Sequence, residues 1–258
     1  MLMRAMAVGL WAPGVADGRV WLTGRHSDVQ GQPAAAILPP MVRRRSSFLT
    51  RMLADVFAQI TTTTDRSSVA SVYASAYGET GALADLLDQL AIEGELSPIR
   101  FCGSVHNAAS GQISIVCENK ALTTSIAAGR HTVAMALLEA QSLLADGIEQ
   151  VAVVCGDVLP PPTLCDARFA PLAAGLLLRG GPPDGTELGL LRDLLADDML
   201  TESIALNSAQ WSNPCSGALV LVDTLLRTTS IRVGLSPVGQ QGWGIDVVAA
   251  SGLPLEVA

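Results

Sequence analysis

The sequence predicts an α/β fold in which helices cover a mixed sheet. Three successive segments carry this prediction. Residues 121–127 are a short apolar and β-branched run typical of a buried strand, and residues 131–145 place apolar side chains at helical spacing. Residues 151–155 are a continuous apolar run, typical of a strand covered on both faces. A tight turn at residues 128–130 joins the first strand to the helix, where open α/β sheets usually place their chemistry.

The composition is that of a globular chain with a sizeable core. Of the 258 residues, 49% are hydrophobic and 16% are charged, and the length suits one large or two small α/β units. Only 4% are aromatic, so alanine, leucine and valine build the core. The net charge of −8 argues against a nucleic-acid partner, which requires a basic surface.

The cysteines and acidic residues indicate neither a disulfide framework nor a metal site. The five cysteines are an odd number without a C-x-x-C pair, so we expect small buried side chains in a reducing cytosol. Asp193, Asp197 and Asp198 lie close together, but no histidine supports them as metal ligands. We find no signal peptide and no apolar run of about 18 residues, and therefore expect a cytoplasmic protein without a membrane span.

The first part of the chain contains two predicted strands and one long amphipathic helix. Residues 6–11 are the first predicted strand, and the turn-rich residues 17–40 are expected to be a surface excursion. Residues 48–60 carry apolar side chains with a clear helical period. Residues 67–76 alternate apolar with small side chains and are predicted to be the second strand.

Three arginines, Arg43, Arg44 and Arg45, come just before the helix at residues 48–60. Positive charge at the start of a helix opposes the helix dipole, which favours another role for these side chains. They form either a solvated turn or a contact for an anion or a carrier protein.

Two further helices are predicted before the central unit. Thr80 is the expected cap of a helix over residues 82–92. Leucines gather on one face of this helix: Leu83, Leu86, Leu87 and Leu90. A short helix is expected over residues 106–118, beneath the strand at residues 121–127.

The last part of the chain adds strands and one helix. Residues 172–178 are a predicted strand, and residues 188–195 are its expected antiparallel neighbour across a Pro-Pro-Asp-Gly turn. Residues 216–227 have helical periodicity, and residues 238–250 are expected to end the fold as a strand. Residues 201–213 show no clear pattern.

Residues 96–157 resemble the β-ketoacyl synthases of the thiolase superfamily. The resemblance rests on a Ser-Pro turn, an Asn-x-x-x-Gly helix start and an apolar helix, which fall here on Ser97-Pro98, on Asn107 with Gly111, and on Ile113-Ser114-Ile115. It implies a thiolase-like N-terminal half, a mixed sheet covered by helices, over residues 1–195. Residues 196–258 would then be a truncated C-terminal remnant, a helix and a terminal strand that pack on the same core.

The resemblance also places a cation where this family carries its nucleophile. Family members have a reactive cysteine at the turn between strand and helix, and the register puts Arg130 there, directly after Gly129. Condensation needs a thiolate and two imidazoles. No cysteine lies between Cys117 and Cys155, and no histidine follows His131. An arginine stays protonated, so the resemblance implies the fold without the condensing activity.

Chain length factors are non-condensing members of this family that line the end of a partner's acyl tunnel, and the resemblance implies that role. The chain would form a heterodimer with a full-length ketosynthase, meet an acyl carrier protein only indirectly, and need no cofactor. The implied tunnel residues are Ile99, Arg100, Phe101, Asn107, Ser110 and Gly111. The implied dimer interface is the strand Leu122, Thr123, Thr124, Ser125, Ile126 and Ala127.

One sequence pattern favours a pathway, and two alternative functions stay open. The pattern R-R-R-S-S-x-L-T-R at residues 43–51 is similar to half-length family members from aryl-polyene pigment clusters, which makes that the favoured pathway. Two alternatives stay open: a stand-alone acyltransferase or thioesterase that uses Cys102 or Cys117 with His106, and a homodimeric scaffold protein. Against the first, His106 can equally be a hydrogen-bonded core histidine and both thiols can be packing residues.

Overall fold

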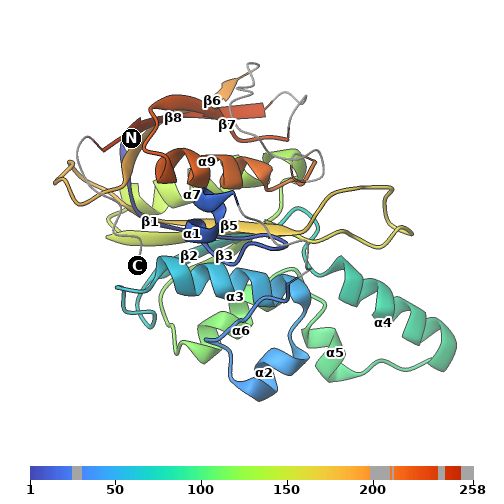
Figure 1. Ribbon diagram of the computed structural model, residues 1–258. Helices are drawn as coiled ribbons and strands as arrows, with labels where there is room; N and C mark the ends of the chain where they lie inside the picture. Colours follow the sequence, from blue (N-terminus) through green and yellow to red (C-terminus); the bar gives the residue numbers. More distant parts are fainter. Residues whose placement is uncertain (25–30, 198–209, 211, 238–241, 251–258) are drawn as a thin grey trace.

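A mixed eight-stranded sheet forms the centre of the molecule (Figure 1). The computed structural model describes residues 1–24, 31–197, 210, 212–237 and 242–250. The strands are β1 (Met3–Trp11), β2 (Ala70–Ala74), β3 (Thr123–Ile126), β4 (Gln150–Asp157), β5 (Leu172–Arg179), β6 (Gly189–Asp197), β7 (Ile231–Gly234) and β8 (Gly242–Ala249). Their order across the sheet is β3-β2-β4-β5-β1-β6-β8-β7. β3, β2 and β4 are parallel, and the other pairs are antiparallel.

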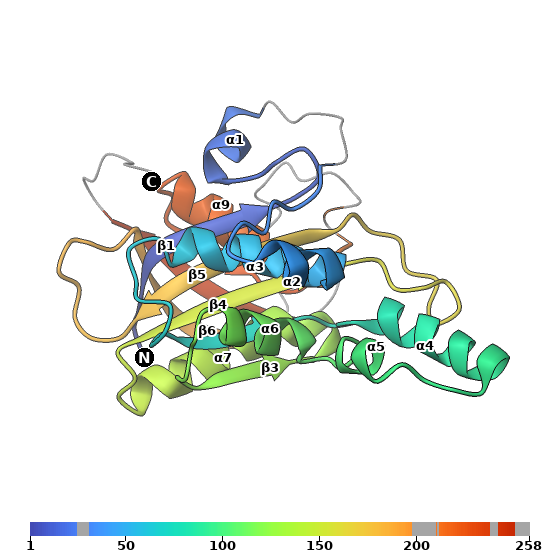
Figure 2. The ribbon, with the colours of Figure 1, turned by 90° about the horizontal axis from the view of Figure 1, so that it is seen from below.

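Helices cover both faces of this sheet. They are α1 (Gly18–Thr23), α2 (Pro40–Arg45), α3 (Phe48–Ile60), α4 (Thr80–Glu93), α5 (Pro98–Cys102), α6 (Ala108–Val116), α7 (Thr132–Ala145) and α9 (Ser216–Leu226). α3 and α6 lie on one face, and α7 and α9 on the other (Figure 1, Figure 2). Within the described ranges, no helix has both the length and the apolar character needed to cross a membrane.

α9 is enclosed by the sheet on two sides. It packs against β5 and β1, and also against β7 and β8, because the strands β6, β8 and β7 curve over it (Figure 1). Every residue of α9 is buried. One apolar core therefore fills the space between α7, α9 and the sheet, and a second lies beneath α3 and α6.

The predicted fold class is confirmed: helices cover a mixed sheet. α3 occupies the predicted residues 48–60, and its buried face includes Leu49, Met52 and Phe57. Ser47 caps α3 by accepting a hydrogen bond from the backbone N–H of Thr50 at 2.9 Å. β4 contains the apolar run at residues 151–155, and all of that run is buried.

β3 is a half-buried edge strand, whereas the apolar run at residues 121–127 predicted a buried one. β2 is its only neighbour in the described sheet, so one long side of β3 faces outward. Burial by α6 and α7 on the two faces cannot cover that side. An apolar run therefore indicates covered faces, but it does not tell a central strand from an edge strand.

The Pro-Pro-Asp-Gly turn predicted that β6 pairs with β5. This prediction is wrong. β1 lies between these two strands and pairs with both. β6 also pairs with β8 on its other side. The connection at residues 180–188 consequently crosses the end of β1 instead of closing a tight hairpin.

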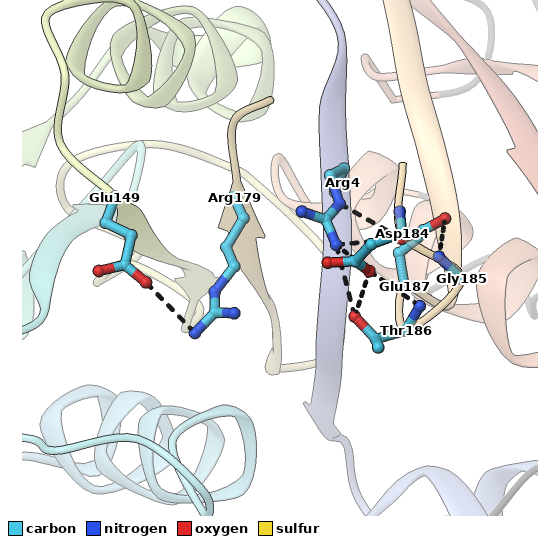
Figure 3. A network of polar contacts seen from close by, with 7 residues as sticks. All are labelled: Arg4, Glu149, Arg179, Asp184, Gly185, Thr186 and Glu187. Carbon is cyan, nitrogen blue, oxygen red and sulfur yellow. Dashed lines mark hydrogen bonds and ion pairs between the residues drawn. The ribbon is translucent and has the colours of Figure 1, made fainter. Parts of the chain in front are cut away.

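Arg4 of β1 holds this crossing connection in place (Figure 3). Its guanidinium forms ion pairs with Asp184 and with Glu187, the second at 3.2 Å. Arg4 and Glu187 are both buried, so neither charge is left unpaired in the interior. Arg179, at the end of β5, makes a separate ion pair with Glu149 at 3.6 Å (Figure 3).

Two local predictions near the N-terminal half were wrong. Residues 17–40 were expected to be a surface excursion, but they contain α1, whose Trp21 is buried against α9 and donates to Asp223 at 2.6 Å. Thr80 was expected to cap α4, but it is the first residue of that helix, after Glu79. α1 itself is capped by local residues, because Asp17 accepts from the backbone N–H groups of Arg19 and Val20 at 2.9 Å.

The chain beyond residue 195 continues on the same sheet. The predicted boundary between residues 1–195 and 196–258 falls inside β6, and β7, β8 and α9 pack with the remaining elements. The division into these two units stays a prediction. The described residues do not include 201–209 and 211, which belong to the segment without a clear sequence pattern. They also do not include 238–241, the start of the last predicted strand.

Candidate functional site

The bend after β3 presents an arginine to solvent. β3 ends at Ile126, and a short 3-10 helix, η1 (Gly129–His131), leads into α7. Gly129 has a φ of 55°, a backbone conformation that favours glycine, so the chain turns directly before Arg130. Arg130 is exposed, and its Nε–H donates to Nε2 of His131 at 3.1 Å. No carboxylate among the described residues forms an ion pair with it.

This bend offers positive charge and no nucleophile. A guanidinium stays protonated and cannot carry an acyl group. Because Arg130 donates to Nε2 of His131, that nitrogen is the acceptor, and a neutral ring carries its proton on Nδ1. The imidazole therefore has no free lone pair with which to act as a general base. The arrangement suits contact with an anionic group instead.

β3, next to this bend, exposes main-chain groups along its outer side. The backbone N–H groups of Ser71 and Ser75 in and after β2 donate to the carbonyls of Leu122 and Ile126 at 2.9 and 3.1 Å. Main-chain groups alternate in direction along a strand, so those of Thr123 and Ser125 point to the open side. This side can accept a further strand in a defined register.

The side chains of Thr123 and Ser125, whose main-chain groups point to the open side, contact neighbouring elements of the molecule. Thr123 Oγ1 lies 3.1 Å from Ser71 Oγ, and Ser125 Oγ lies 2.9 Å from Ser110 Oγ. These hydroxyl contacts fix the strand against β2 and α6. No described strand pairs with the open side of β3, so its outward main-chain groups can accept a further strand.

Three of the six predicted tunnel residues, Ile99, Asn107 and Gly111, line one hollow of about 470 Å³. The hollow lies between α2, α5 and α6, and its lining is mainly apolar. Arg45 of α2 also lines it, so the structure brings part of the arginine segment together with part of the predicted tunnel.

The other three predicted tunnel residues lie outside this hollow. Arg100 donates to Oε1 of Gln89 on α4 at 2.9 Å. Phe101 is exposed on α5. Ser110 is buried at its contact with Ser125 and supports β3 from below. The structure thus divides the six residues into two groups, and their role in a tunnel stays a prediction.

The three arginines were predicted to oppose the dipole at the start of a helix. In the structure they lie instead at the end of a helix. They form the last turn of α2, where positive charge is favourable. Arg43 donates to the carbonyl of Ala34 at 3.0 Å, whereas Arg44 and Arg45 are exposed. The two exposed guanidinium groups are available for an anion beside the hollow.

His106 has a structural role in the described contacts. Its Nε2–H donates to the carbonyl of Ser75 at 2.8 Å, and its ring fills the space beside Gly78, where a Cβ atom would lie 2.6 Å from His106 Cδ2. No hydrogen bond joins His106 to Cys102 or Cys117 among the described residues. Burial raises the pKa of Cys117, which lowers its thiolate fraction at neutral pH.

The cysteines were predicted to be buried, and two of the five are. Cys155 and Cys215 lie in the core, and burial raises the pKa of Cys155 to about 12. Cys117 and Cys165 are half-buried, and Cys102 is exposed on α5. A buried thiol with a raised pKa is a poor nucleophile, so the two core cysteines are packing residues.

A buried carboxylate that the sequence analysis missed joins the ends of β2 and β4. Asp157 accepts hydrogen bonds from Ser75 Oγ at 2.6 Å, from the backbone N–H groups of Ala76 and Tyr77 at 2.9 and 3.0 Å, and from Cys215 Sγ at 3.3 Å. Burial raises its pKa in spite of these donors. The available signal was an aspartate two residues after the apolar run at residues 151–155.

No cluster of histidine, cysteine, aspartate or glutamate that could hold a metal ion occurs among the described residues. Asp193 and Asp197 lie on β6, and Asp198 lies outside the described residues. The guanidinium of Arg192 pairs with Asp193 at 3.7 Å.

Solved structures share this fold over nearly the whole chain. A chain from "Ketosynthase (ApeO) in Complex with its Chain Length Factor (ApeC) from Xenorhabdus doucetiae" has a TM-score of 0.73 and 21% identity, covering 96% of this chain and 99% of that one. A chain from the complex AntDE:AntF, a type II PKS acyl-carrier protein with its ketosynthase bound to the hexaketide, has a TM-score of 0.73 and 12% identity, with the same coverage of 96% and 99%.

A third structure, the ishigamide ketosynthase/chain length factor, has a TM-score of 0.63 and 14% identity, covering 87% of this chain and 74% of that one. No curated protein matches the sequence. A family model described as β-ketoacyl synthase, N-terminal domain, matches residues 20–232. That match spans most of the 258 residues of this chain, so the chain belongs to the β-ketoacyl synthase N-terminal domain family.

Proposed function

We propose that this chain is a non-catalytic, ketosynthase-like subunit that acts as a chain length factor. It pairs with a full-length β-ketoacyl-carrier-protein synthase and shapes that partner's acyl tunnel in aryl-polyene, polyketide or fatty-acid-type biosynthesis. The observation that carries the proposal is the exposed Arg130 in the bend where the family register calls for the nucleophile. A condensing enzyme cannot use a permanent cation at that point.

The similar structures support a role in a complex. The printed description of the Xenorhabdus doucetiae structure names a ketosynthase together with its chain length factor. Coverage of 96% of this chain and 99% of the matched chain means that the two chains are nearly equal in length. A short chain of this fold inside such a complex is what the proposal requires.

Pairing takes place along β3. The outward main-chain groups of Thr123 and Ser125 would hydrogen-bond an edge strand of the ketosynthase and join the two sheets. The residues directly before and after β3, Leu122 and Ala127, are exposed and become covered in the complex. Arg130 then lies beside the new interface, where it suits a carboxylate of the partner.

Length control is steric. Ile99 and Phe101 on α5 expose large apolar side chains that need a cover, which the partner supplies. Burying two more methylenes of a growing chain gains only about 1.5 kcal/mol. A side chain that clashes with one further two-carbon unit therefore stops growth. The exposed Arg44 and Arg45 would contact the acidic or phosphorylated part of a carrier protein near the hollow.

The test compares two substitutions of Ser125 in co-expression with the full-length ketosynthase of the same organism. Ser125→Pro removes the outward N–H of β3, whereas Ser125→Ala removes only the hydroxyl contact with Ser110. We expect a 1:1 complex for the unsubstituted chain and for Ser125→Ala, measured by size-exclusion chromatography with light scattering. We expect none for Ser125→Pro.

The unsubstituted chain alone is expected not to elongate a malonyl-derived acyl thioester. Its failure to form a stable complex with any ketosynthase of its organism would contradict the proposal. Condensation by the purified chain alone would contradict it as well.

A further inference from the structure

α4 extends away from the sheet (Figure 1, Figure 2). Its main packing neighbour is α5, and Leu86 is its one buried residue. Leu83, Leu87 and Leu90, the leucine stripe, follow one another at helical spacing and are 40%, 55% and 42% exposed. A stripe of this kind normally faces a core, but here the described residues leave about half of each side chain exposed.

Polar contacts, and not the leucine stripe, hold α4 in this position. Glu79, directly before the helix, accepts hydrogen bonds from Ser47 Oγ at 2.6 Å and from Thr50 Oγ1 at 3.0 Å. Near the other end, Gln89 accepts from Arg100 of α5 at 2.9 Å. The stripe is therefore preformed and unused, and its burial is available to stabilise a complex.

The charge around the stripe restricts what can bind. Residues 79–97 contain five acidic residues and no lysine or arginine. Asp85, Asp88 and Glu93 lie exposed on the other sides of α4. An acidic carrier protein would be repelled here, whereas an apolar surface bordered by lysine or arginine would be attracted.

Further exposed apolar residues lie on the elements between α4 and the open edge of the sheet (Figure 2). Ile99 and Phe101 of α5, Ile115 of α6 and Leu122 beside β3 are exposed apolar residues on the elements that link the two regions. A partner that pairs with β3 is thus placed to reach α4 as well.

We propose that the leucine stripe of α4 docks on the ketosynthase that pairs with β3, against an apolar surface bordered by basic residues. This inference rests on the proposed function and adds a second contact that is separate from strand pairing. It assigns α4 the task of choosing among partners by charge, while β3 supplies main-chain hydrogen bonds that any edge strand could satisfy.

The experiment uses the full-length chain, the full-length ketosynthase of the same organism, and a pair of matched leucines. Leu87→Glu changes the stripe, and Leu164→Glu changes an exposed leucine in the connection between β4 and β5, with 52% exposure against 55%. We expect Leu87→Glu to weaken the Kd at least tenfold by isothermal titration calorimetry, and Leu164→Glu to change it less than twofold. Asp85→Lys with Asp88→Lys should also weaken binding, more strongly at low salt.

Circular dichroism and thermal unfolding check that each variant is folded, and Leu83→Ser replaces Leu87→Glu if the latter unfolds. Equal Kd values for the stripe and control variants, together with loss of binding in Ser125→Pro, would overturn the docking role while the proposed function stands. If the unsubstituted chain binds no ketosynthase, the proposed function fails first. Self-association that Leu87→Glu abolishes in analytical ultracentrifugation would then assign the stripe to a second copy and overturn the inference.

Discussion

Arg130 changes the chemistry of its bend without requiring a different backbone. Gly129 makes the turn and η1 leads into α7, so the strand, turn and helix that would display a nucleophile are all in place. The guanidinium takes the exposed position and engages His131. The bend therefore keeps its backbone while it presents a cation to solvent.

Glu79 gives a prediction of how the unfolding free energy depends on pH. Burial raises its pKa above the ordinary value of 4.5, so the folded state holds the proton more tightly than the unfolded state does. Ionisation therefore opposes folding, and the stability contributed by the protonated form is lost as pH rises through the folded pKa. Glu79→Gln keeps an oxygen for Ser47 and Thr50 but cannot ionise.

We expect the unfolding free energy of the unsubstituted chain to rise, relative to Glu79→Gln, when the pH is lowered from 7 towards 5. Urea unfolding at both pH values measures the difference. A gap between the two proteins that does not change with pH would show that Glu79 ionises as freely in the folded state as in the unfolded chain.

The assignment of Arg130 to the nucleophile position rests on the family register, which relates it to a local strand and helix, and it stays a prediction. The sequence did not identify Glu79 or Asp157 as buried carboxylates. Their burial depends on Ser47, Thr50 and Cys215, which lie far away in the chain. The local sequence does not show which distant residues will hydrogen-bond these carboxylates.

At the scale of elements, periodic segments were predictable and strand neighbours were less so. α3, α7 and α9 lie where helical spacing of apolar residues placed them, because each buries apolar side chains against the sheet. The pairing of β6 was wrong because a turn sequence predicts a hairpin only when no other strand enters between its arms. β7, four residues long, was not predicted at all.

Gly217 gives a prediction for the packing of α9. A Cβ atom on Gly217 would lie 2.3 Å from the backbone oxygen of Leu235, which cannot move without shifting the end of β7. We expect Gly217→Ala to lower the unfolding free energy by about 2 to 3 kcal/mol, measured by urea titration.

Gly111, inside α6, is the matched control because nothing lies within 4 Å of its Cβ position. Gly111→Ala should raise stability by up to about 1 kcal/mol, through helix propensity alone. Similar losses in both variants would mean that the close approach of α9 to Leu235 is not what requires glycine at residue 217.

At the scale of the whole molecule, the curved sheet lets a short chain enclose its own core. β7 and β8 cover α9 on the side away from β5. One sheet thus covers α9 on two sides. The sequence has no histidine after His131, whereas condensation in the family needs two imidazoles.

Restoring a thiol should therefore not restore condensation. We expect Arg130→Cys in the purified chain to react with iodoacetamide and yet to form no elongated product from acyl and malonyl carrier proteins, as measured by mass spectrometry. The full-length ketosynthase is the positive control. An elongated product from the substituted chain alone would show that imidazoles from elsewhere are dispensable.

The placement of β1 between β5 and β6 has a consequence for synthesis on the ribosome. Residues 3–11 have no sheet partner until residues 172–197 have been made. At about 5 to 20 residues per second, β1 waits for roughly 10 to 40 seconds after it leaves the ribosome exit tunnel. During that interval the main-chain groups of β1 lack their strand partners, and the ion pairs of Arg4 with Asp184 and Glu187 can close only at its end.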